Sequence, residues 1–232
     1  MFIIGLDFSI NYGSYCISKN FEEFYFGTII NDKSISLKRK SELISISEYV
    51  DNFNVIFTNR TDDKSKDNYD YIKSERLKLL NHIEISSKLI NEINKITTYS
   101  RDIIVGIEGM SYGSKGSAAF DIPHATGILK RDIVFDLINS DLNKLFIFTP
   151  GELKNTIGAK GNAGKDIIYD MFMENPIIEH VKENDFYNYL IKHKDEKFIR
   201  NIGKNGVTIE SPFSDMIDAY LSVLKIYTLL KK

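Results

Sequence analysis

Cysteine is almost absent from this chain, because Cys16 is the only one among 232 residues. A single cysteine excludes an internal disulfide framework and a zinc site built from thiolates. Since Cys16 stands in an apolar run, we interpret it as a small buried core residue rather than a reactive thiol. The four histidines show no metal-ligand spacing, so we expect surface or helix-capping roles for them.

The sequence also lacks a strong excess of charge of either sign. It has 30 lysines and arginines against 32 aspartates and glutamates, a net charge of −2, and an isoelectric point of about 6.1. A polyanionic partner would therefore have to contact a local basic patch. With 43% hydrophobic and 27% charged residues, the composition excludes disordered and collagen-like chains.

Long apolar runs are missing as well, since no stretch reaches the roughly 18 consecutive apolar residues of a membrane span. Residues 1–6 lead straight into a strand-like run, without the basic region and cleavage site of a secretory signal. We therefore expect no membrane partner and a cytoplasmic setting, in a bacterial cell or a virus-infected host cell. The length suits one sizeable core, which predicts a single domain over residues 1–232.

Short apolar runs and helical periodicities predict the order of elements. We expect strands at residues 2–7, 13–18, 24–30, 103–108 and 145–148. We expect helices at residues 72–98, from after 117 to about 139, at 165–173 and at 214–230. The first three strands have short connections and pair antiparallel, whereas the later strands alternate with helices. This order predicts an α/β fold with a mixed five-stranded sheet flanked by helices.

Two segments, residues 31–70 and 174–210, fit this order poorly. The first contains charged, loop-like stretches at 38–40 and 62–67, and between them residues 55–58 form an edge strand or one arm of a hairpin. The second is charged and only weakly periodic. We interpret both segments as insertions within the domain.

Four acidic residues stand where apolar packing would be expected. Asp7 and Glu108 each end a predicted strand, and the carboxyl ends of neighbouring parallel strands meet at one rim of a sheet. Asp215 and Asp218 are three residues apart near the start of the last helix, so they share one face. Each acid alone is more commonly a turn or cap residue. The joint pattern, however, predicts one acidic cluster.

Four carboxylates at one point repel one another and would take up protons without a counter-charge. Hard divalent cations, which prefer oxygen ligands, supply that charge. Two such ions about 4 Å apart can activate water and stabilise the leaving oxygen in phosphodiester hydrolysis. The sequence therefore predicts two Mg²⁺ ions per active site, with Mn²⁺ as a substitute.

Four short sequence blocks strengthen this interpretation. They are residues 5–9; Ile107-Glu108 with Ser117-Ala118 and Gly127; Thr149-Pro150 with Leu153-Lys154, Gly158, Gly161, Ala163 and Lys165; and residues 215–221. In this order they resemble the RuvC family of Holliday-junction resolvases, and a phage-type member of that family is one interpretation. The resemblance implies an RNase H-like fold and a crossover-junction endodeoxyribonuclease that makes paired nicks. It also implies a homodimer that places two active sites on opposing strands of a four-way junction.

The resemblance assigns roles to individual residues. It implies that Asp7, Glu108, Asp215 and Asp218 bind the metal ions and that Lys154 and Lys165 face the scissile region, with Lys165 in the catalytic set. Those two lysines bracket a glycine-rich segment whose backbone can approach a phosphate closely. Further predicted DNA contacts are Lys160 in that segment, and Tyr112 and Lys115 in the loop after Glu108. Tyr112 would stack on an unpaired base at the crossover, although an exposed loop tyrosine is an equally common interpretation.

Three alternatives remain open at this point. The same chemistry could act on forks, flaps or R-loops, because the two extra segments alter which DNA shape fits. A noncatalytic junction-binding protein is a second alternative, against which the intact set of acids argues. An actin-like phosphotransferase also begins with a strand that ends in Asp, but this chain is too short for the nucleotide-binding glycines of its later half.

Overall fold

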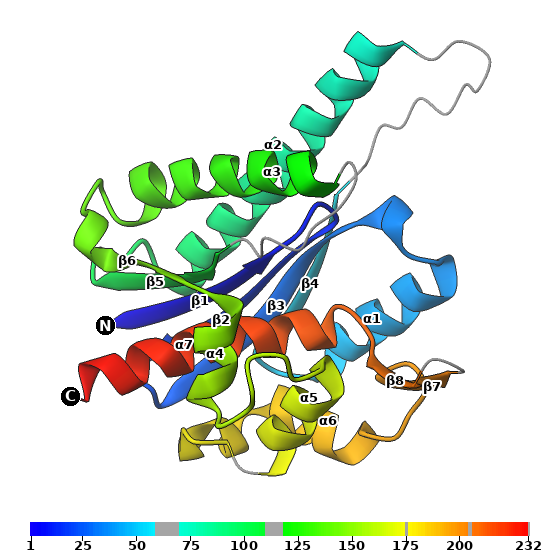
Figure 1. Cartoon of the computed structure of the whole chain (residues 1–232), viewed down its shortest axis with the longest axis vertical. Coiled ribbons are helices and arrows are strands. Elements are labelled where there is room, and N and C mark those ends of the chain that lie inside the picture. Colours follow the sequence, from blue (N-terminus) through cyan, green and yellow to red (C-terminus); the bar gives the residue numbers. More distant parts are fainter. Residues whose placement is uncertain (59–69, 110–117, 175, 204–205, 232) are drawn as a thin grey trace.

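A mixed six-stranded sheet forms the centre of the computed structural model, which describes residues 1–58, 70–109, 118–174, 176–203 and 206–231 (Figure 1). The strands are β1 (Phe2–Phe8), β2 (Tyr12–Lys19), β3 (Glu23–Asn31), β4 (Phe53–Thr58), β5 (Ile103–Glu108) and β6 (Leu145–Phe148). Their spatial order is β4-β3-β2-β1-β5-β6. β1, β2 and β3 are antiparallel neighbours, whereas β4 pairs parallel with β3, β5 with β1, and β6 with β5.

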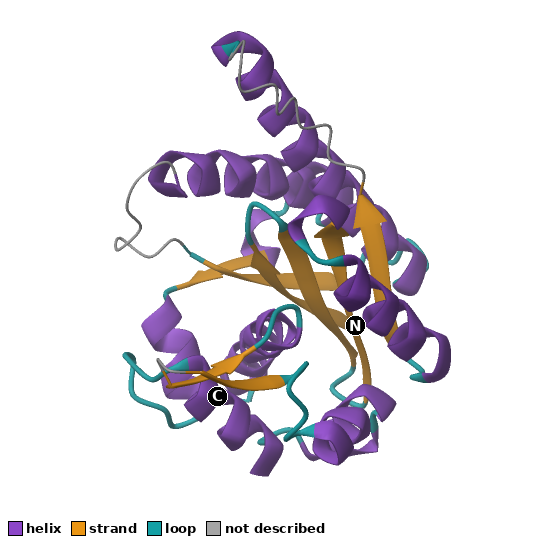
Figure 2. Ribbon diagram, turned by 90° about the vertical axis from the view of Figure 1, so that its right-hand side faces the viewer, coloured by secondary structure: helices purple, strands orange, loops and turns teal. Residues whose placement is uncertain are grey.

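Helices cover both faces of this sheet (Figure 2). They are α1 (Leu37–Tyr49), α2 (Tyr71–Ile96), α3 (Ala118–Asp132), α4 (Pro150–Thr156), α5 (Lys165–Glu174), α6 (Asp185–His193) and α7 (Phe213–Leu230). A π-helical segment at Ile133–Leu137 continues α3, and 3-10 helices lie at Asp32–Ser34, Leu142–Lys144 and Glu179–Glu183. A separate hairpin consists of β7 (Arg200–Gly203) and β8 (Gly206–Ile209).

The predicted α/β class and the mixed sheet are confirmed, but the expected strand number was too low. Residues 53–58 form a sixth strand at the edge of the sheet, parallel to β3, and not the arm of a hairpin. Residues 38–40 are helical rather than loop-like, because Ser36 caps α1 by accepting a hydrogen bond from the backbone N–H of Arg39. Leu43 and Ile46 then anchor this helix in the core. Residues 62–67 lie outside the described part of the chain.

Alternation along the strands divides the core into two layers. Ile3 of β1 packs on the side of α7, whereas Ile4 and Leu6 pack on the opposite side, toward α2 and α3. This follows from the two-residue period of strand side chains. Within the described residues, no helix is long and apolar enough to span a membrane.

Helix α7 lies closer to the sheet than side chains would normally permit. Gly5 and Gly106 are register partners on β1 and β5. A Cβ atom at Gly5 would overlap the backbone carbonyl oxygen of Ala219, and one at Gly106 would lie 2.9 Å from Ile226 Cδ1. The two glycines therefore form a shallow seat for α7, and only residues without a Cβ permit this approach.

Candidate metal centre and active site

The two strand-end acids follow the glycine seat directly. Asp7 and Glu108 each come two residues after a seat glycine, so their side chains point to the same side of the sheet as α7. β1 and β5 are parallel and adjacent, which brings their carboxyl ends to one rim. The strand pairing thus places two carboxylates beside the start of α7.

Helix α7 contributes the other two acids. One carboxylate oxygen from each of Asp7, Asp215 and Asp218 lies within 4.8 Å of the others. Asp215 is buried, at 7% exposure, and the Asp218 side chain is 16% exposed. Glu108 is not one of these three residues, but its charge contributes to raising the pKa of Asp7, and the charge of Asp218 contributes to raising that of Glu108. The structure therefore brings three of the four predicted acids together, and the fourth interacts with them electrostatically.

Lys165 supplies a positive charge to the acidic cluster. It is the first residue of α5, and its Nζ donates a hydrogen bond of 2.8 Å to Asp215 Oδ1 and lies 3.4 Å from Asp218 Oδ2. Its Nζ also donates to Ser214 Oγ over 3.1 Å, and Ser214 Oγ donates to Asp215 Oδ1 over 2.9 Å. These contacts fix the Asp215 carboxylate, while half of the Lys165 side chain stays exposed to solvent.

The pKa values show that one lysine does not balance the carboxylates. Burial first, and then the charges of Asp215, Asp218 and Glu108, raise the pKa of Asp7 well above its usual value. Burial and the Asp218 charge raise the pKa of Glu108 to about 7. The pKa of Asp218 is also raised, chiefly by burial. Uncompensated negative charge of this kind is what a bound cation would relieve.

The donor set fits a hard divalent ion. All four groups offer carboxylate oxygens, and no described histidine or cysteine belongs to the group of residues that could ligate a metal here. Oxygen-only ligation is the preference of Mg²⁺ and of Mn²⁺. The chemistry of the donor set thus fits a hard divalent cation.

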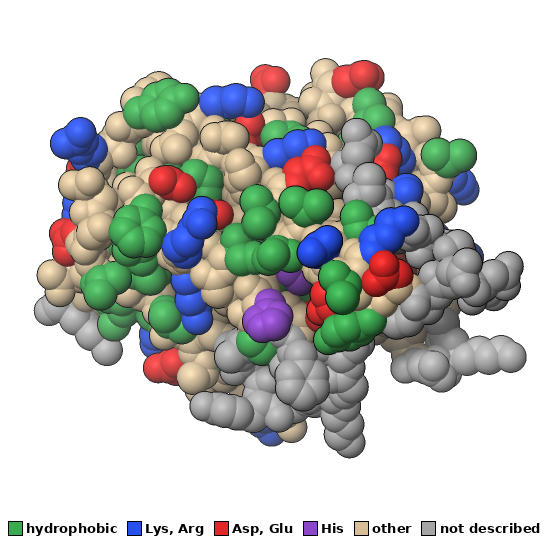
Figure 3. All heavy atoms as spheres, turned by 90° about the horizontal axis from the view of Figure 1, so that it is seen from above, with side chains coloured by type: hydrophobic (Ala, Val, Ile, Leu, Met, Phe, Trp, Pro, Cys, Tyr) green, Lys and Arg blue, Asp and Glu red, His purple; other side chains and the backbone are tan. Residues whose placement is uncertain are grey.

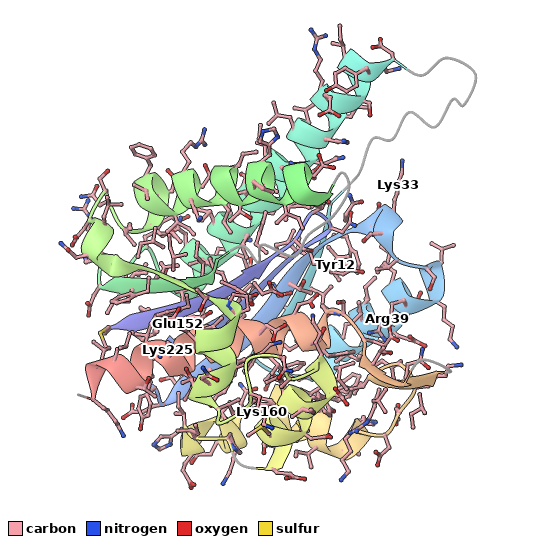
Figure 4. The ribbon with its side chains drawn as sticks, viewed as in Figure 1. Tyr12, Lys33, Arg39, Glu152, Lys160 and Lys225 are labelled. Carbon is pink, nitrogen blue, oxygen red and sulfur yellow. The ribbon has the colours of Figure 1, made fainter. Side chains whose placement is uncertain are left out.

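The predicted DNA-contacting lysines have different surroundings. Lys154, in α4, donates through Nζ to the backbone carbonyl of Ala163 over 2.8 Å, and its charge lowers the pKa values of Glu108 and Asp218. It therefore holds the glycine-rich turn against α4 at the rim of the cluster. Lys160 is exposed in that turn (Figure 4). Tyr112 and Lys115 lie outside the described residues.

Sequence reasoning missed two residues beside the acids. Ser214 orients Asp215, and its position immediately before that acid was the available signal. Ser14 is the cross-strand partner of Asp7, fully buried, and donates to Thr28 Oγ1 over 3.1 Å. No signal in the sequence singled out Ser14, because β2 contains a second fully buried serine, Ser18.

A groove lies beside the cluster without including any of its acids. Its volume is about 1040 Å³, and it is bounded by α1, the segment before β7, the end of β8 and Tyr12 (Figure 4). The charged residues that line it balance, because Lys38, Arg39 and Lys197 face Glu42, Glu196 and Glu210. Tyr12 connects the two regions, since the Asp215 charge, after burial, contributes to raising the pKa of Tyr12.

The sequence matches no protein-family model and no curated protein. In structure, the chain is similar to Thermus thermophilus RuvC, with a TM-score of 0.44 and 10% identity over 100% of this chain and 97% of the other. It is similar to T. thermophilus RuvC in complex with a Holliday junction substrate, with a TM-score of 0.48 and 9% identity over 100% and 95%. It is also similar to the yeast mitochondrial Holliday junction resolvase Ydc2, with a TM-score of 0.47 and 13% identity over 99% and 80%. These proteins are of the kind that the sequence blocks resemble.

Proposed function

We propose that this chain is a metal-dependent endodeoxyribonuclease that hydrolyses phosphodiester bonds in branched DNA and resolves four-way junctions by paired nicks. One observation carries the proposal, namely the convergence of Asp7, Glu108, Asp215 and Asp218 around Lys165. The residues come from β1, β5, α7 and α5, which are far apart in the chain. A merely structural ion pair would not need four carboxylates.

The acids would hold two Mg²⁺ or Mn²⁺ ions, which supply an activated water and charge stabilisation for the leaving oxygen. Asp7, Asp215 and Asp218 would form the inner ligand set because their oxygens already lie together. Glu108, with a pKa of about 7, would complete the set in its charged form above neutral pH. Ser214 holds Asp215 in a single orientation.

Lys165 would act on the substrate side of the same site. Its ammonium contacts Ser214, Asp215 and Asp218, and its side chain is half exposed, so a phosphate oxygen could replace one of these three partners. Burial alone would lower the pKa of Lys165, but Asp215, Asp218 and Asp7 together raise it above its usual value. The residue therefore stays cationic at every pH at which the acids can bind metal.

The branched-DNA substrate is proposed from the sequence blocks and from the lysines around the glycine-rich turn. Phosphate contacts by Lys154 and Lys160 would position the DNA without reading its sequence. The net charge of −2 agrees with a local contact of this kind. Paired nicks require two active sites, and we propose a homodimer for that reason.

The test is cleavage of labelled four-way junctions, flaps, forks and linear duplexes in the presence of Mg²⁺ or Mn²⁺. Asp7→Asn is expected to abolish cleavage, because it removes a charge from the inner ligand set, and to retain junction binding. Asp136→Asn serves as the matched control, because Asp136 is exposed on the other side of the sheet. Cleavage by Asp7→Asn at the wild-type rate would remove this cluster from the mechanism. Equal rates on junction and linear duplex would refute selectivity for branched DNA.

A further inference from the structure

Arg39 joins three parts of the molecule that are distant in the chain. It lies in the first turn of α1 and is partly buried. Its guanidinium donates to the backbone carbonyl of Phe198, just before β7, and to that of Ser211, just after β8, the latter over 2.9 Å. One side chain therefore spans both ends of the β7–β8 hairpin.

Two aromatic rings hold the guanidinium in place. The Arg39 Cζ atom lies 5.5 Å from the centre of the Phe198 ring and 5.1 Å from that of Phe213. The two rings contact each other edge to face at 5.6 Å. Contacts of a cation with ring faces at these distances are favourable, and more so where water is excluded.

The partners of Arg39 are backbone carbonyls and rings rather than acids. Among the described residues, no carboxylate forms an ion pair with it. An arginine committed to carbonyl acceptors on two segments fixes their relative position, because the planar guanidinium presents its donors in a rigid fork. Lysine carries its donors on one nitrogen and lacks the planar fork, so it would not reproduce this geometry in full.

Ser211 and Pro212, called the clamped segment because Arg39 binds the Ser211 carbonyl, lead directly into the acidic cluster. Ser211 is two residues before Phe213, the fully buried first residue of α7. Asp215 follows two residues later, within the first turn of the same helix. The backbone N–H of Met216 donates to the Pro212 carbonyl over 3.0 Å, so the clamped segment and the first turn are one hydrogen-bonded unit. A shift at Ser211 would therefore reach Asp215 and Asp218 without an intervening loop.

We infer that Arg39 is a positioning residue for the metal centre. It acts through Ser211 and Phe213 to fix the first turn of α7 and hence the Asp215 and Asp218 carboxylates. The inference rests on the proposed function, because it takes those acids as metal ligands. It also assigns a role to α1, which then supports the site in addition to lining the groove.

The adjacent residue offers a matched control. Lys40, in the same helical turn, forms an ion pair of 3.2 Å with Asp32 and lies 4.7 Å from the centre of the Phe57 ring. Lys40→Ala therefore removes one ion pair and one cation–ring contact of α1 and none with the start of α7, whereas Arg39→Ala removes two hydrogen bonds and two cation–ring contacts. Arg39→Lys keeps the charge and loses the planar fork of donors.

The experiment compares wild type, Arg39→Ala, Arg39→Lys and Lys40→Ala in two measurements, each well below the melting temperature of every variant. Hydrogen exchange over residues 213–219 of the metal-free protein reports on the first turn of α7. Mn²⁺ affinity, followed by the electron paramagnetic resonance of free Mn²⁺, reports on the ligand set. We expect faster exchange and a roughly tenfold or greater loss of affinity in Arg39→Ala, as for outer-shell partners of metal ligands. Arg39→Lys should recover part of both effects, and Lys40→Ala should resemble wild type.

The outcomes separate the two proposals. Unchanged Mn²⁺ affinity in Arg39→Ala would overturn the positioning role, and so would equal effects of Arg39→Ala and Lys40→Ala. Failure of the wild-type protein to bind Mn²⁺ would instead refute the metal centre itself. In that case the exchange measurement would still show whether Arg39 fixes the start of α7.

Discussion

At the scale of single residues, the candidate site is a balance between burial and charge. Asp7 and Glu108 both have raised pKa values, with burial as the largest cause and neighbouring carboxylates next. Lys165 opposes this effect without cancelling it. The metal-free cluster is therefore a source of instability at neutral pH, and cation binding would convert it into a source of stability.

This balance predicts a pH-dependent stability for the metal-free protein. The pKa of Glu108 rises from about 4.3 in an unfolded chain to about 7 in the fold. The folded state thus binds the proton more tightly, and the stability contributed by this proton is fully present below about pH 4 and lost as the pH rises through 7. Glu108→Gln is therefore expected to raise the melting temperature of metal-free protein at pH 8, and to raise it much less at pH 5.

Thermal melting at the two pH values, with and without Mg²⁺, measures this effect. Glu179→Gln is the control, since the Glu179 side chain is 84% exposed and distant from the cluster. A Glu108→Gln variant that melts below wild type at pH 8 without metal would contradict the raised pKa. Added Mg²⁺ should raise the melting temperature of wild type more than that of the variant.

At the scale of elements, the site depends on how closely α7 approaches β1 and β5. Gly5 and Gly106 permit the approach, and the acids two residues further on each strand then meet the first turn of the helix. The pairing of a glycine with an acid two residues later occurs in both strands. The same strand positions therefore determine both how closely α7 packs on the sheet and where the acids lie.

Gly5→Ala is expected to destabilise the protein, because the added methyl group would overlap the Ala219 carbonyl oxygen. Overpacking of this kind typically costs about 1–3 kcal/mol. Gly127→Ala is the matched control, since Gly127 lies in α3 with nothing within 4 Å of an added Cβ. There alanine should stabilise by roughly 0.5–1 kcal/mol through its helix propensity. Urea denaturation measures the free energy of unfolding of both variants and of wild type. A Gly5→Ala variant as stable as Gly127→Ala would show that α7 can shift at no cost.

The elements also show what the sequence could predict. Strand-end acids on apolar runs and an acid pair in a helix are local patterns, and their joint order along the chain predicted four clustered carboxylates. The structure places oxygens of Asp7, Asp215 and Asp218 within 4.8 Å of one another. The proposed positioning role of Arg39 could not be predicted from the sequence, because its two acceptors are backbone carbonyls 159 and 172 residues further along the chain. The sequence did not distinguish an edge strand from a hairpin arm for the sixth strand, because residues 53–58 show no regular alternation of polar and apolar side chains.

At the scale of the whole molecule, α2 exposes an apolar face. Its N-terminal turns extend beyond the rest of the fold (Figures 1 and 2). Ile72, Leu79 and Ile83, spaced along one face, are 61%, 50% and 43% exposed. Figure 3 shows the face of the molecule seen from above, on which hydrophobic side chains lie among charges of both signs. An apolar helix face of this kind suits contact with a second copy of the chain.

The proposed homodimer is therefore expected to depend on α2. Leu79→Lys combined with Ile83→Lys should convert the protein to a monomer in sedimentation analysis, because the charges would have to be buried in the interface. A variant with Leu142→Lys, at an equally exposed apolar residue outside α2, should remain dimeric. A wild-type protein that sediments as a monomer at assay concentrations would argue against paired nicks by one assembly.

The glycine seat beneath α7 limits which substitutions the protein can accept. The same backbone approach closes the core and sets the spacing of the carboxylates, so neither can be adjusted alone. A substitution that loosens the helix for greater mobility would also disperse the ligands, and one that tightens it would crowd them. Variation in substrate preference would then have to arise at groove residues outside the contacts of Arg39 with α7, such as Lys38 and Glu42, which pair with each other.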